Sequence, residues 1–207
     1  MEVNPHDLLE IACKSDLISY SPQPDWVGLS LDRAPFVVVR RARSAEGFIS
    51  VGVRGEKRNE RFAAFLPGDR IVKRVTPEQL AYEQKWKERP EKLFTYVDEV
   101  SCMMEKFSLN WGPTGSVGFE LASDKETVTE TSDVDVIIRA DSRLTNELSR
   151  QLMVELRKFP VAVDVQVELL EGAFSLSEYA SVKDGEILLR TMDGPILKQI
   201  GALKMES

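Results

Sequence analysis

The stretch Ser132-Asp133-Val134-Asp135-Val136-Ile137-Ile138 places two aspartates at the start of an apolar, β-branched run. Such a run predicts a buried strand over residues 134–138. Side chains alternate between the two faces of a strand, so we expect Asp133 and Asp135 to project to the same side, about 7 Å apart. Two carboxylates this close repel each other unless a cation lies between them. The stretch therefore predicts either a divalent-metal site or a turn in which Ser132 and Asp133 cap the start of the strand.

A glycine-containing turn lies upstream, in Trp111-Gly112-Pro113-Thr114-Gly115-Ser116. We expect a short strand over residues 109–112 and a brief helix over residues 117–122, with Gly115 and Ser116 between them. Backbone N–H groups at the start of a helix can hold phosphate, and Ser116 adds a hydroxyl group. Gly115 and Ser116 are therefore candidate phosphate-binding residues.

A third aspartate follows downstream on a second predicted strand. Leucines repeat every four residues between Thr145 and Lys158, which predicts an amphipathic helix there. Residues 161–167 alternate strictly and predict a strand, with Asp164 on the same face as Gln166. A carboxylate in so apolar a strand is costly to bury without a partner, which a metal site on a neighbouring strand would provide. The alternative is an edge strand with Asp164 in water.

These three features in this order are the pattern of the nucleotidyltransferase superfamily, which residues 90–170 resemble. The resemblance implies Mg²⁺ (or Mn²⁺) held by Asp133, Asp135 and Asp164, and phosphoryl-type transfer from a nucleotide-like substrate. Mg²⁺ suits this chemistry because it accepts a few carboxylates together with water and substrate phosphate oxygens.

The front of the chain is basic, although the net charge of the whole is −7. Short β-branched or alternating runs predict strands over residues 35–40, 49–54 and 70–73. We also expect a short helix over residues 6–11, a helix from Thr76-Pro77 to about Pro90, and another over residues 93–107. The predicted fold class is α+β: a basic β-rich N-terminal domain over residues 1–76, a helical junction over residues 77–90, and a nucleotidyltransferase-like catalytic domain with a mixed sheet over residues 91–207.

Three arginines of the basic segment are candidate phosphate ligands. Arg54, Arg58 and Arg61 are spaced by four and three residues, so they would share one face of a helix if the chain is helical there. Arginine side chains that bind a phosphate group would explain a basic patch in an acidic protein. The alternative is a solvated surface on which these arginines pair with Glu56 and Glu60.

A narrower resemblance covers most of the chain. It rests on Pro5-His6-Asp7-Leu8, on Val51-Gly52-Val53-Arg54-Gly55 with Arg58 and Arg61, on Gly115-Ser116-Val117-Gly118-Phe119-Glu120-Leu121 followed by Ser132-Asp133-Val134-Asp135, and on Leu189-Arg190-Thr191-Met192-Asp193-Gly194-Pro195. These segments and the length resemble the phosphoribosyl-dephospho-CoA transferases of malonate decarboxylase, also called malonate decarboxylase holo-acyl-carrier-protein synthases.

The narrower resemblance implies a donor and an acceptor. The donor is triphosphoribosyl-dephospho-CoA, and its phosphoribosyl-dephospho-CoA prosthetic group passes to a serine of the apo acyl carrier protein, with release of pyrophosphate. Asp133 and Asp135 match the essential acidic pair of that family, whereas Asp164 rests on the wider superfamily. Because an acyl carrier protein is acidic, residues 40–43 could also steer that partner.

Two other classes of function stay open at this point. The first is another metal-dependent nucleotidyltransferase, either the citrate lyase acyl-carrier-protein type or a small-molecule adenylyltransferase. The second is a non-catalytic module that binds a carrier protein. Retention of Ser116 and of the three aspartates favours an enzyme over a module.

Composition excludes several further classes. No apolar run approaches the roughly 20 residues of a membrane-spanning helix, and the N-terminal residues do not resemble a signal peptide, so we expect a cytoplasmic protein without a membrane partner. The net charge of −7 argues against a nucleic-acid partner. His6 is the single histidine, which disfavours a histidine base, and Cys13 and Cys102 are expected to be reduced, buried thiols.

Overall fold

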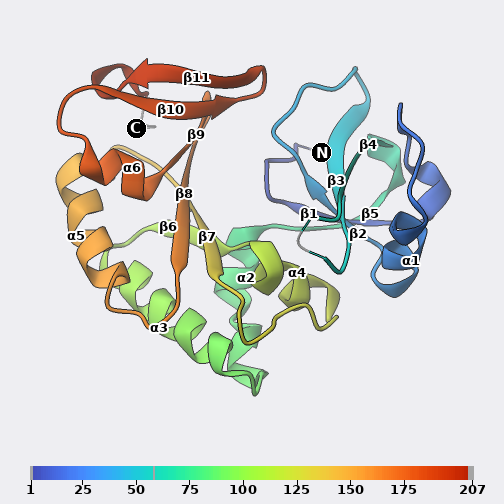
Figure 1. Cartoon of the computed structure of the whole chain (residues 1–207), viewed down its shortest axis with the longest axis horizontal. Coiled ribbons are helices and arrows are strands. Elements are labelled where there is room, and N and C mark those ends of the chain that lie inside the picture. Colours follow the sequence, from blue (N-terminus) through green and yellow to red (C-terminus); the bar gives the residue numbers. More distant parts are fainter. Residues whose placement is uncertain (1, 58, 205–207) are drawn as a thin grey trace. The chain divides into compact units, whose positions relative to one another are not determined.

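The computed structural model describes residues 2–57 and 59–204, and the chain divides into two units. The first is Met1–Thr76 with Phe119–Thr127, and the second is Pro77–Gly118 with Val128–Ser207. The described residues form two sheets, one in each unit, together with helices (Figure 1). The predicted α+β class, with a β-rich N-terminal part and a mixed C-terminal sheet, is confirmed.

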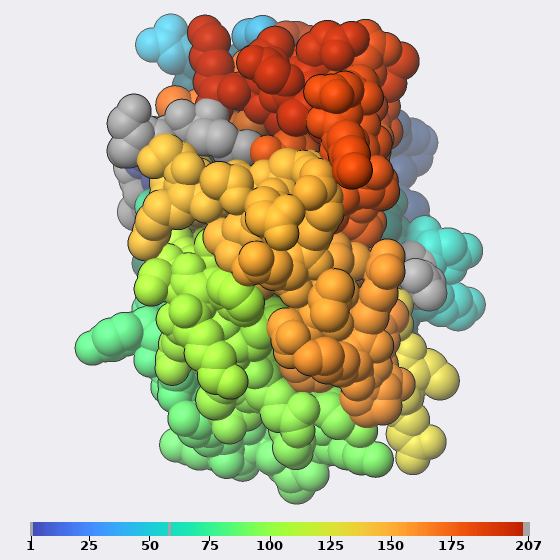
Figure 2. Space-filling view, turned by 90° about the vertical axis from the view of Figure 1, so that its left-hand side faces the viewer, coloured from blue at the N-terminus to red at the C-terminus, as the bar shows by residue number. Residues whose placement is uncertain are grey.

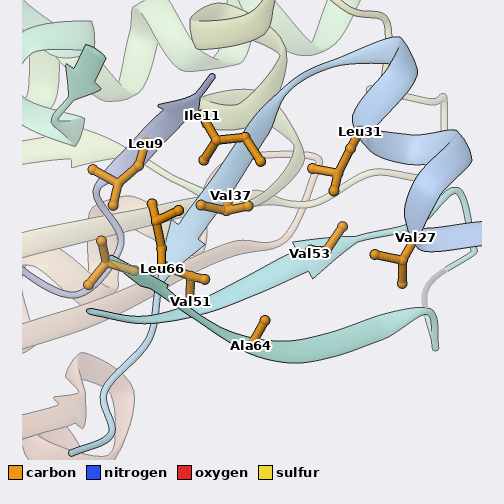
Figure 3. Packing of buried hydrophobic residues seen from close by; sticks show 10 residues of the cluster. Leu9, Ile11, Val27, Leu31, Val37, Val51, Val53, Ala64 and Leu66 are labelled. Atoms are coloured by element: carbon orange, nitrogen blue, oxygen red, sulfur yellow. The ribbon is translucent and has the colours of Figure 1, made fainter. Parts of the chain in front are cut away.

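The first unit is built on a five-stranded antiparallel sheet with the order β4-β3-β2-β1-β5. Its elements are β1 (Leu8–Ile11), η1 (Lys14–Asp16), α1 (Asp25–Arg33), β2 (Phe36–Val39), β3 (Phe48–Arg54), β4 (Arg61–Pro67), η2 (Gly68–Arg70) and β5 (Ile71–Val75). Val27 and Leu31 of α1 pack with apolar side chains of the strands to form the core (Figure 3). This core makes the first unit a folded domain of its own.

The helix predicted over residues 6–11 was wrong, because Leu8–Ile11 is the strand β1. The apolar run lies between β2 and β5, and Leu8, Leu9 and Ile11 are all buried. A strand that is buried on both of its faces reads as a continuous apolar run and loses the alternation by which strands are recognised. Long-range pairing therefore decided the conformation of this segment.

The second unit is built on a six-stranded sheet with the order β11-β10-β9-β8-β7-β6. Its strands are β6 (Asn110–Pro113), β7 (Val134–Arg139), β8 (Val163–Leu169), β9 (Gly172–Ser175), β10 (Glu186–Thr191) and β11 (Gly194–Gln199). Its helices are α2 (Pro77–Glu83), η3 (Lys85–Glu88), α3 (Lys92–Lys106), the start of α4 (Gly115–Ser123), α5 (Asn146–Leu156), α6 (Leu176–Ser181) and η4 (Ile200–Ala202). The pair β7–β8 is parallel and the other pairs are antiparallel, so the sheet is mixed.

The parallel pair requires a crossover connection, which α5 supplies. Thr145 caps its start, because its side chain accepts a hydrogen bond from the N–H of Leu148 at 3.1 Å. In Figure 1 α3, α5 and α6 lie on one side of the sheet, and α3 and α5 form the outer surface seen in Figure 2. The buried face of β7 carries Val134, Val136 and Ile138. The helical layer and this apolar face form the core of the second unit.

The other face of the sheet carries the polar residues Asp135 and Arg139 of β7 on either side of the buried Ile137, and α2 packs on it at the β6 edge. A Cβ atom added to Gly112 would lie 2.1 Å from the backbone carbonyl carbon of Pro77, so only glycine allows this approach. The helix predicted from Pro77 to about Pro90 instead breaks at Gln84, which has a φ of 51°. The break lets Trp86 turn to the buried face of the sheet and pack against Trp111, with ring centroids 6.1 Å apart.

The two cysteines and the lengths of the helices bear on two further predictions from the sequence. Cys13 and Cys102 are exposed, so their predicted burial was wrong. Cys102 lies on the outward side of α3, where the apolar spacing of the helix does not reach it. Within residues 2–57 and 59–204, no helix is long and apolar enough to cross a membrane.

Candidate active site

The candidate site is centred on two aspartates that lie side by side on neighbouring strands. Asp135 of β7 is paired with Asp164 of β8 in the parallel ladder. Paired residues of adjacent strands are about 5 Å apart and project to the same face. Asp135 is half-buried and Asp164 is exposed. Asp164 therefore lies on an interior strand of the sheet, and the alternative that it lies on an edge strand was wrong. Its side chain is nevertheless open to solvent.

Asp133 lies outside this ladder. The strand begins at Val134, whose N–H donates a hydrogen bond to the carbonyl of Ala162 at 2.9 Å, and Asp133 is the half-exposed residue before it. In the described part of the chain, no three His, Cys, Asp or Glu side chains lie together as a group that could hold a metal. The structure thus brings Asp135 and Asp164 together, while Asp133 stays a predicted ligand.

The first residue of α4 packs against the Asp135 carboxylate. Gly115 has a φ of +59°, and a Cβ atom added to it would lie 2.0 Å from Oδ2 of Asp135. The N–H of Thr114 donates a hydrogen bond to the backbone carbonyl of Asp135 at 2.8 Å. Gly115 is exposed and Ser116 is buried. The predicted strand–turn–helix arrangement is present, and it sets the start of a helix beside the acidic pair.

The predicted arginines lie in the N-terminal unit, on the hairpin between β3 and β4. The chain is not helical there: Arg54 is the last residue of β3 and Arg61 is the first residue of β4. They are nevertheless direct cross-strand partners, and such partners project to the same face. Arg58 lies outside the described residues. A role for these arginines in binding phosphate stays a prediction.

A chain of polar side chains runs along the same face of β7 and β8. Arg139 donates a hydrogen bond through Nε to Glu78 of α2 at 2.7 Å, and its Nη1 lies 3.5 Å from Oε2 of Glu168. Glu168 is 4% exposed and accepts a hydrogen bond from Nε2 of Gln166 at 2.7 Å. Our sequence interpretation assigned no role to Arg139 and Glu168. Every second residue of a strand lies on the same face, so counting in steps of two from Asp135 and Asp164 would have placed Arg139 and Glu168 on this face.

This arrangement is suited to a reaction at a phosphate group. Two adjacent carboxylates can share a divalent cation or accept a proton, and the start of a helix next to them favours an anion. The strands that carry the carboxylates are held by a parallel ladder, so the pair is rigid. Rigid acidic groups beside a phosphate-binding turn are the parts that phosphoryl transfer requires.

Two family models together match nearly the whole chain. The model described as the phosphoribosyl-dephospho-CoA transferase MdcG N-terminal domain matches residues 4–77. The model described as the phosphoribosyl-dephospho-CoA transferase MdcG C-terminal domain matches residues 79–200 and contains the acidic pair.

Curated relatives with the name phosphoribosyl-dephospho-CoA transferase match over most of their length. The relative from Pseudomonas fluorescens is 37% identical to this chain, and the match covers 84% of this chain and 83% of the relative. The relative from Klebsiella pneumoniae is 36% identical, and the match covers 92% of this chain and 91% of the relative. A third, from Azotobacter vinelandii, is 34% identical, with 92% and 90% covered. No solved structure matches the chain.

Proposed function

The chain belongs to the phosphoribosyl-dephospho-CoA transferase family, and from that membership we propose that it modifies the apo acyl carrier protein of malonate decarboxylase. In this proposal triphosphoribosyl-dephospho-CoA is the donor and a carrier serine is the acceptor. The serine receives the phosphoribosyl-dephospho-CoA group, and pyrophosphate is released. Transferase activity follows from the family, whereas the acceptor and the leaving group are the proposal.

The observation that carries the proposal is the register of Asp135 with Asp164 beside Gly115. A donor with a triphosphate brings several negative charges to the site, and the helix start at Gly115 is an electrostatically favourable place for them. A pair of carboxylates at the same place would repel that donor without a cation. The acidic pair and the phosphate turn are therefore compatible only if a cation joins them.

The residues present fit Mg²⁺ or Mn²⁺. Mg²⁺ in phosphoryl-transfer sites is commonly bound through one or two carboxylates, with water and substrate phosphate oxygens completing its shell. Asp135 and Asp164 would supply the carboxylates, and Asp133 would be a further ligand from the residue before β7. When bound, the ion would neutralise negative charge on the transferred phosphate and on the leaving group.

The side chains and backbone of this chain would position the reacting groups. The N–H groups of the first turn of α4, with the hydroxyl of Ser116, would hold the terminal phosphates of the donor. The carrier serine oxygen would bond to the phosphorus nearest the ribose as the bond to the pyrophosphate oxygen breaks. Asp164, the exposed member of the pair, would take the serine proton where it does not bind the ion, and otherwise the proton would pass to solvent water. Positioning and charge neutralisation would supply most of the rate enhancement, without a protein nucleophile.

The assignment of the carrier rests on the resemblance to the malonate decarboxylase enzymes. An acyl carrier protein is acidic, and the N-terminal unit contains the basic segment of the chain. Arg54 and Arg61 project together from the β3–β4 hairpin and would bind either donor phosphate or carrier carboxylates. The acceptor therefore has to be tested with carriers from two sources.

The proposal is tested by weighing the carrier. The protein is incubated with Mg²⁺ and triphosphoribosyl-dephospho-CoA, together with the apo carrier protein of malonate decarboxylase or, in parallel, that of citrate lyase. We expect the malonate decarboxylase carrier to gain the mass of one phosphoribosyl-dephospho-CoA group, with an equal amount of pyrophosphate released. No mass gain on either carrier contradicts the proposal, and a gain on the citrate lyase carrier alone reassigns the acceptor.

The metal is tested by removing it. EDTA is expected to abolish the mass gain, and added Mn²⁺ is expected to restore it. Binding of Mn²⁺ followed by electron paramagnetic resonance should be lost in Asp135→Asn. Full activity in EDTA-treated, metal-free protein contradicts the metal assignment without touching the proposed acceptor.

A further inference from the structure

The face of β8 that carries Asp164 continues past the acidic pair to a neutral polar pair. Gln166 follows Asp164 by two residues and therefore projects to the same face, about 7 Å further along the strand. Ser175 of β9 lies directly opposite Gln166 in the antiparallel ladder. Both residues are half-buried. In Figure 1 the two strands run next to each other between β7 and β10.

The carboxamide of Gln166 has a fixed orientation. Its Nε2 atom donates a hydrogen bond at 2.7 Å to Glu168, whose carboxylate is acceptor-only and 4% exposed. Glu168 is held in turn by Arg139, which is tied to Glu78 of α2. A buried charged chain of this kind is costly to build, because each desolvated charge must be compensated. Through Glu168 these contacts reach the neutral side chain of Gln166, which lies on the same face as the acidic pair.

We propose that Gln166 and Ser175 form a binding subsite for the uncharged, hydroxyl-bearing nucleoside part of the donor. This inference rests on the proposed function and extends it, because it gives the donor a direction on the sheet. The phosphates would lie at Asp135 and Asp164, and the nucleoside would extend along β8 toward Gln166. Glu168 is then a positioning residue, which acts on the donor only through the carboxamide.

The chemistry of the pair selects this part of the donor over the phosphates. A carboxamide and a hydroxyl group both donate and accept hydrogen bonds but carry no charge, which suits sugar hydroxyls and the polar edge of a base. Phosphate would be drawn to arginine or to a helix start, and the nearest ion-paired neighbour, Glu168, would repel it. The Ser175 hydroxyl lies 2.8 Å from that of Ser177 and can still take part in a further hydrogen bond, because a hydroxyl group has one donor and two acceptor sites.

The test compares three variants of the full-length protein with the wild type. Gln166→Leu removes the hydrogen-bonding groups at similar size, and Ser175→Ala is the milder second variant. Gln151→Leu is the matched control, because Gln151 is exposed on α5, on the opposite side of the sheet. The measurements are kcat and KM for the donor with the carrier as acceptor, and calorimetric binding of dephospho-CoA, which carries the nucleoside but not the triphosphate.

We expect Gln166→Leu to raise the donor KM and the dephospho-CoA Kd by about tenfold, the effect of losing one hydrogen bond, with kcat nearly unchanged. Ser175→Ala should also raise the donor KM and the dephospho-CoA Kd, and Gln151→Leu should change neither constant. Unchanged dephospho-CoA binding in folded Gln166→Leu overturns the inference, and so does a fall in kcat alone. If Gln166→Leu does not fold, the test uses Ser175→Ala, and unchanged dephospho-CoA binding in that variant overturns the inference.

The two proposals fail in different ways. If the wild-type protein transfers nothing to a carrier, the proposed function fails, while the binding of dephospho-CoA still tests the subsite. If transfer occurs and the variants bind dephospho-CoA as tightly as the wild type, only the subsite is overturned.

Discussion

Asp135 and Asp164 are direct partners in the parallel pairing of β7 with β8. Their side chains therefore leave the sheet at the same level and on the same face, although α5 separates the two strands in the sequence. The start of α4 at Gly115 packs against the first of them. These three elements place two acidic groups and the predicted phosphate-binding turn within one small region of the second unit.

Gly115 is expected to tolerate no side chain. In Gly115→Ala the added Cβ would lie 2.0 Å from Oδ2 of Asp135, at a φ of +59° that L side chains rarely adopt. We expect a loss of about 1–3 kcal/mol in the free energy of unfolding, together with loss of transfer activity. Urea unfolding and the carrier assay measure both. Gly201→Ala is the control, because its added Cβ meets nothing within 4 Å; equal stability of the two variants would contradict the described packing.

Arg139 is expected to stabilise the catalytic sheet by neutralising a buried carboxylate. Arg139→Met leaves Glu168, which is 4% exposed, without its guanidinium group. Breaking a buried ion pair in this way costs about 3–5 kcal/mol in unfolding free energy. Denaturant unfolding of Arg139→Met and of the double variant Arg139→Met/Glu168→Gln tests this. The double variant should recover part of the loss, since the buried charge is gone; no recovery would argue against a charge effect.

The ion pair between Glu171 and Lys198 makes a pH-dependent contribution to stability. Burial raises the pKa of Glu171, but hydrogen bonds from the Lys198 ammonium and the Lys204 N–H outweigh this and hold the pKa below its usual 4.5. Because the folded-state pKa is the lower one, the contribution is present above pH 4.5 and is lost as the pH falls through the folded-state pKa. We expect Lys198→Met to lose about 1 kcal/mol at neutral pH and progressively less as the pH is lowered below 4.5. Urea unfolding of both proteins at neutral and at acidic pH measures this, and an equal loss at both would contradict the assignment.

Arg54 and Arg61 are expected to contribute to substrate binding and not to stability. They project together from the β3–β4 hairpin, so we expect Arg54→Gln/Arg61→Gln to raise the KM for the donor or for the carrier about tenfold or more. Steady-state kinetics with each substrate varied in turn identifies which one. Arg157→Gln is the control, since Arg157 is exposed at the end of α5. Unchanged KM values for both substrates would leave the basic hairpin without a role in the reaction.

Much of the second unit could be predicted from the sequence, because its elements have strong local signals. The leucine repeat predicted α5, and the apolar spacing of residues 93–107 predicted α3. The Asp135 and Asp164 strands were also predicted, since each is a run of β-branched residues. The pairing of Asp135 with Asp164 was not predictable from spacing, because a parallel register depends on how the crossover packs.

The errors lie where tertiary contacts override local pattern. Leu8–Ile11 was predicted as a helix because a strand that is buried on both faces does not alternate between apolar and polar residues. The spacing of Arg54 and Arg61 would align their side chains only on a helix, whereas the β3–β4 hairpin brings them together as cross-strand partners. Among the elements that were not predicted are α1, β4, β9 and α6; the signals of the first two are weak, since Asp25–Arg33 contains a glycine and β4 contains two alanines.

The central claim is that Asp135 and Asp164 form the reaction centre, and pyrophosphate release under single-turnover conditions tests it most directly. The wild type, Asp135→Asn and Asp164→Asn are compared with Asp184→Asn, which changes an exposed aspartate in the loop before β10. We predict rates lower by about a hundredfold or more in the first two variants, with unfolding free energies at least equal to that of the wild type because a like-charge repulsion is relieved. Asp184→Asn should react at the wild-type rate. Wild-type rates in folded Asp135→Asn and Asp164→Asn would contradict the account.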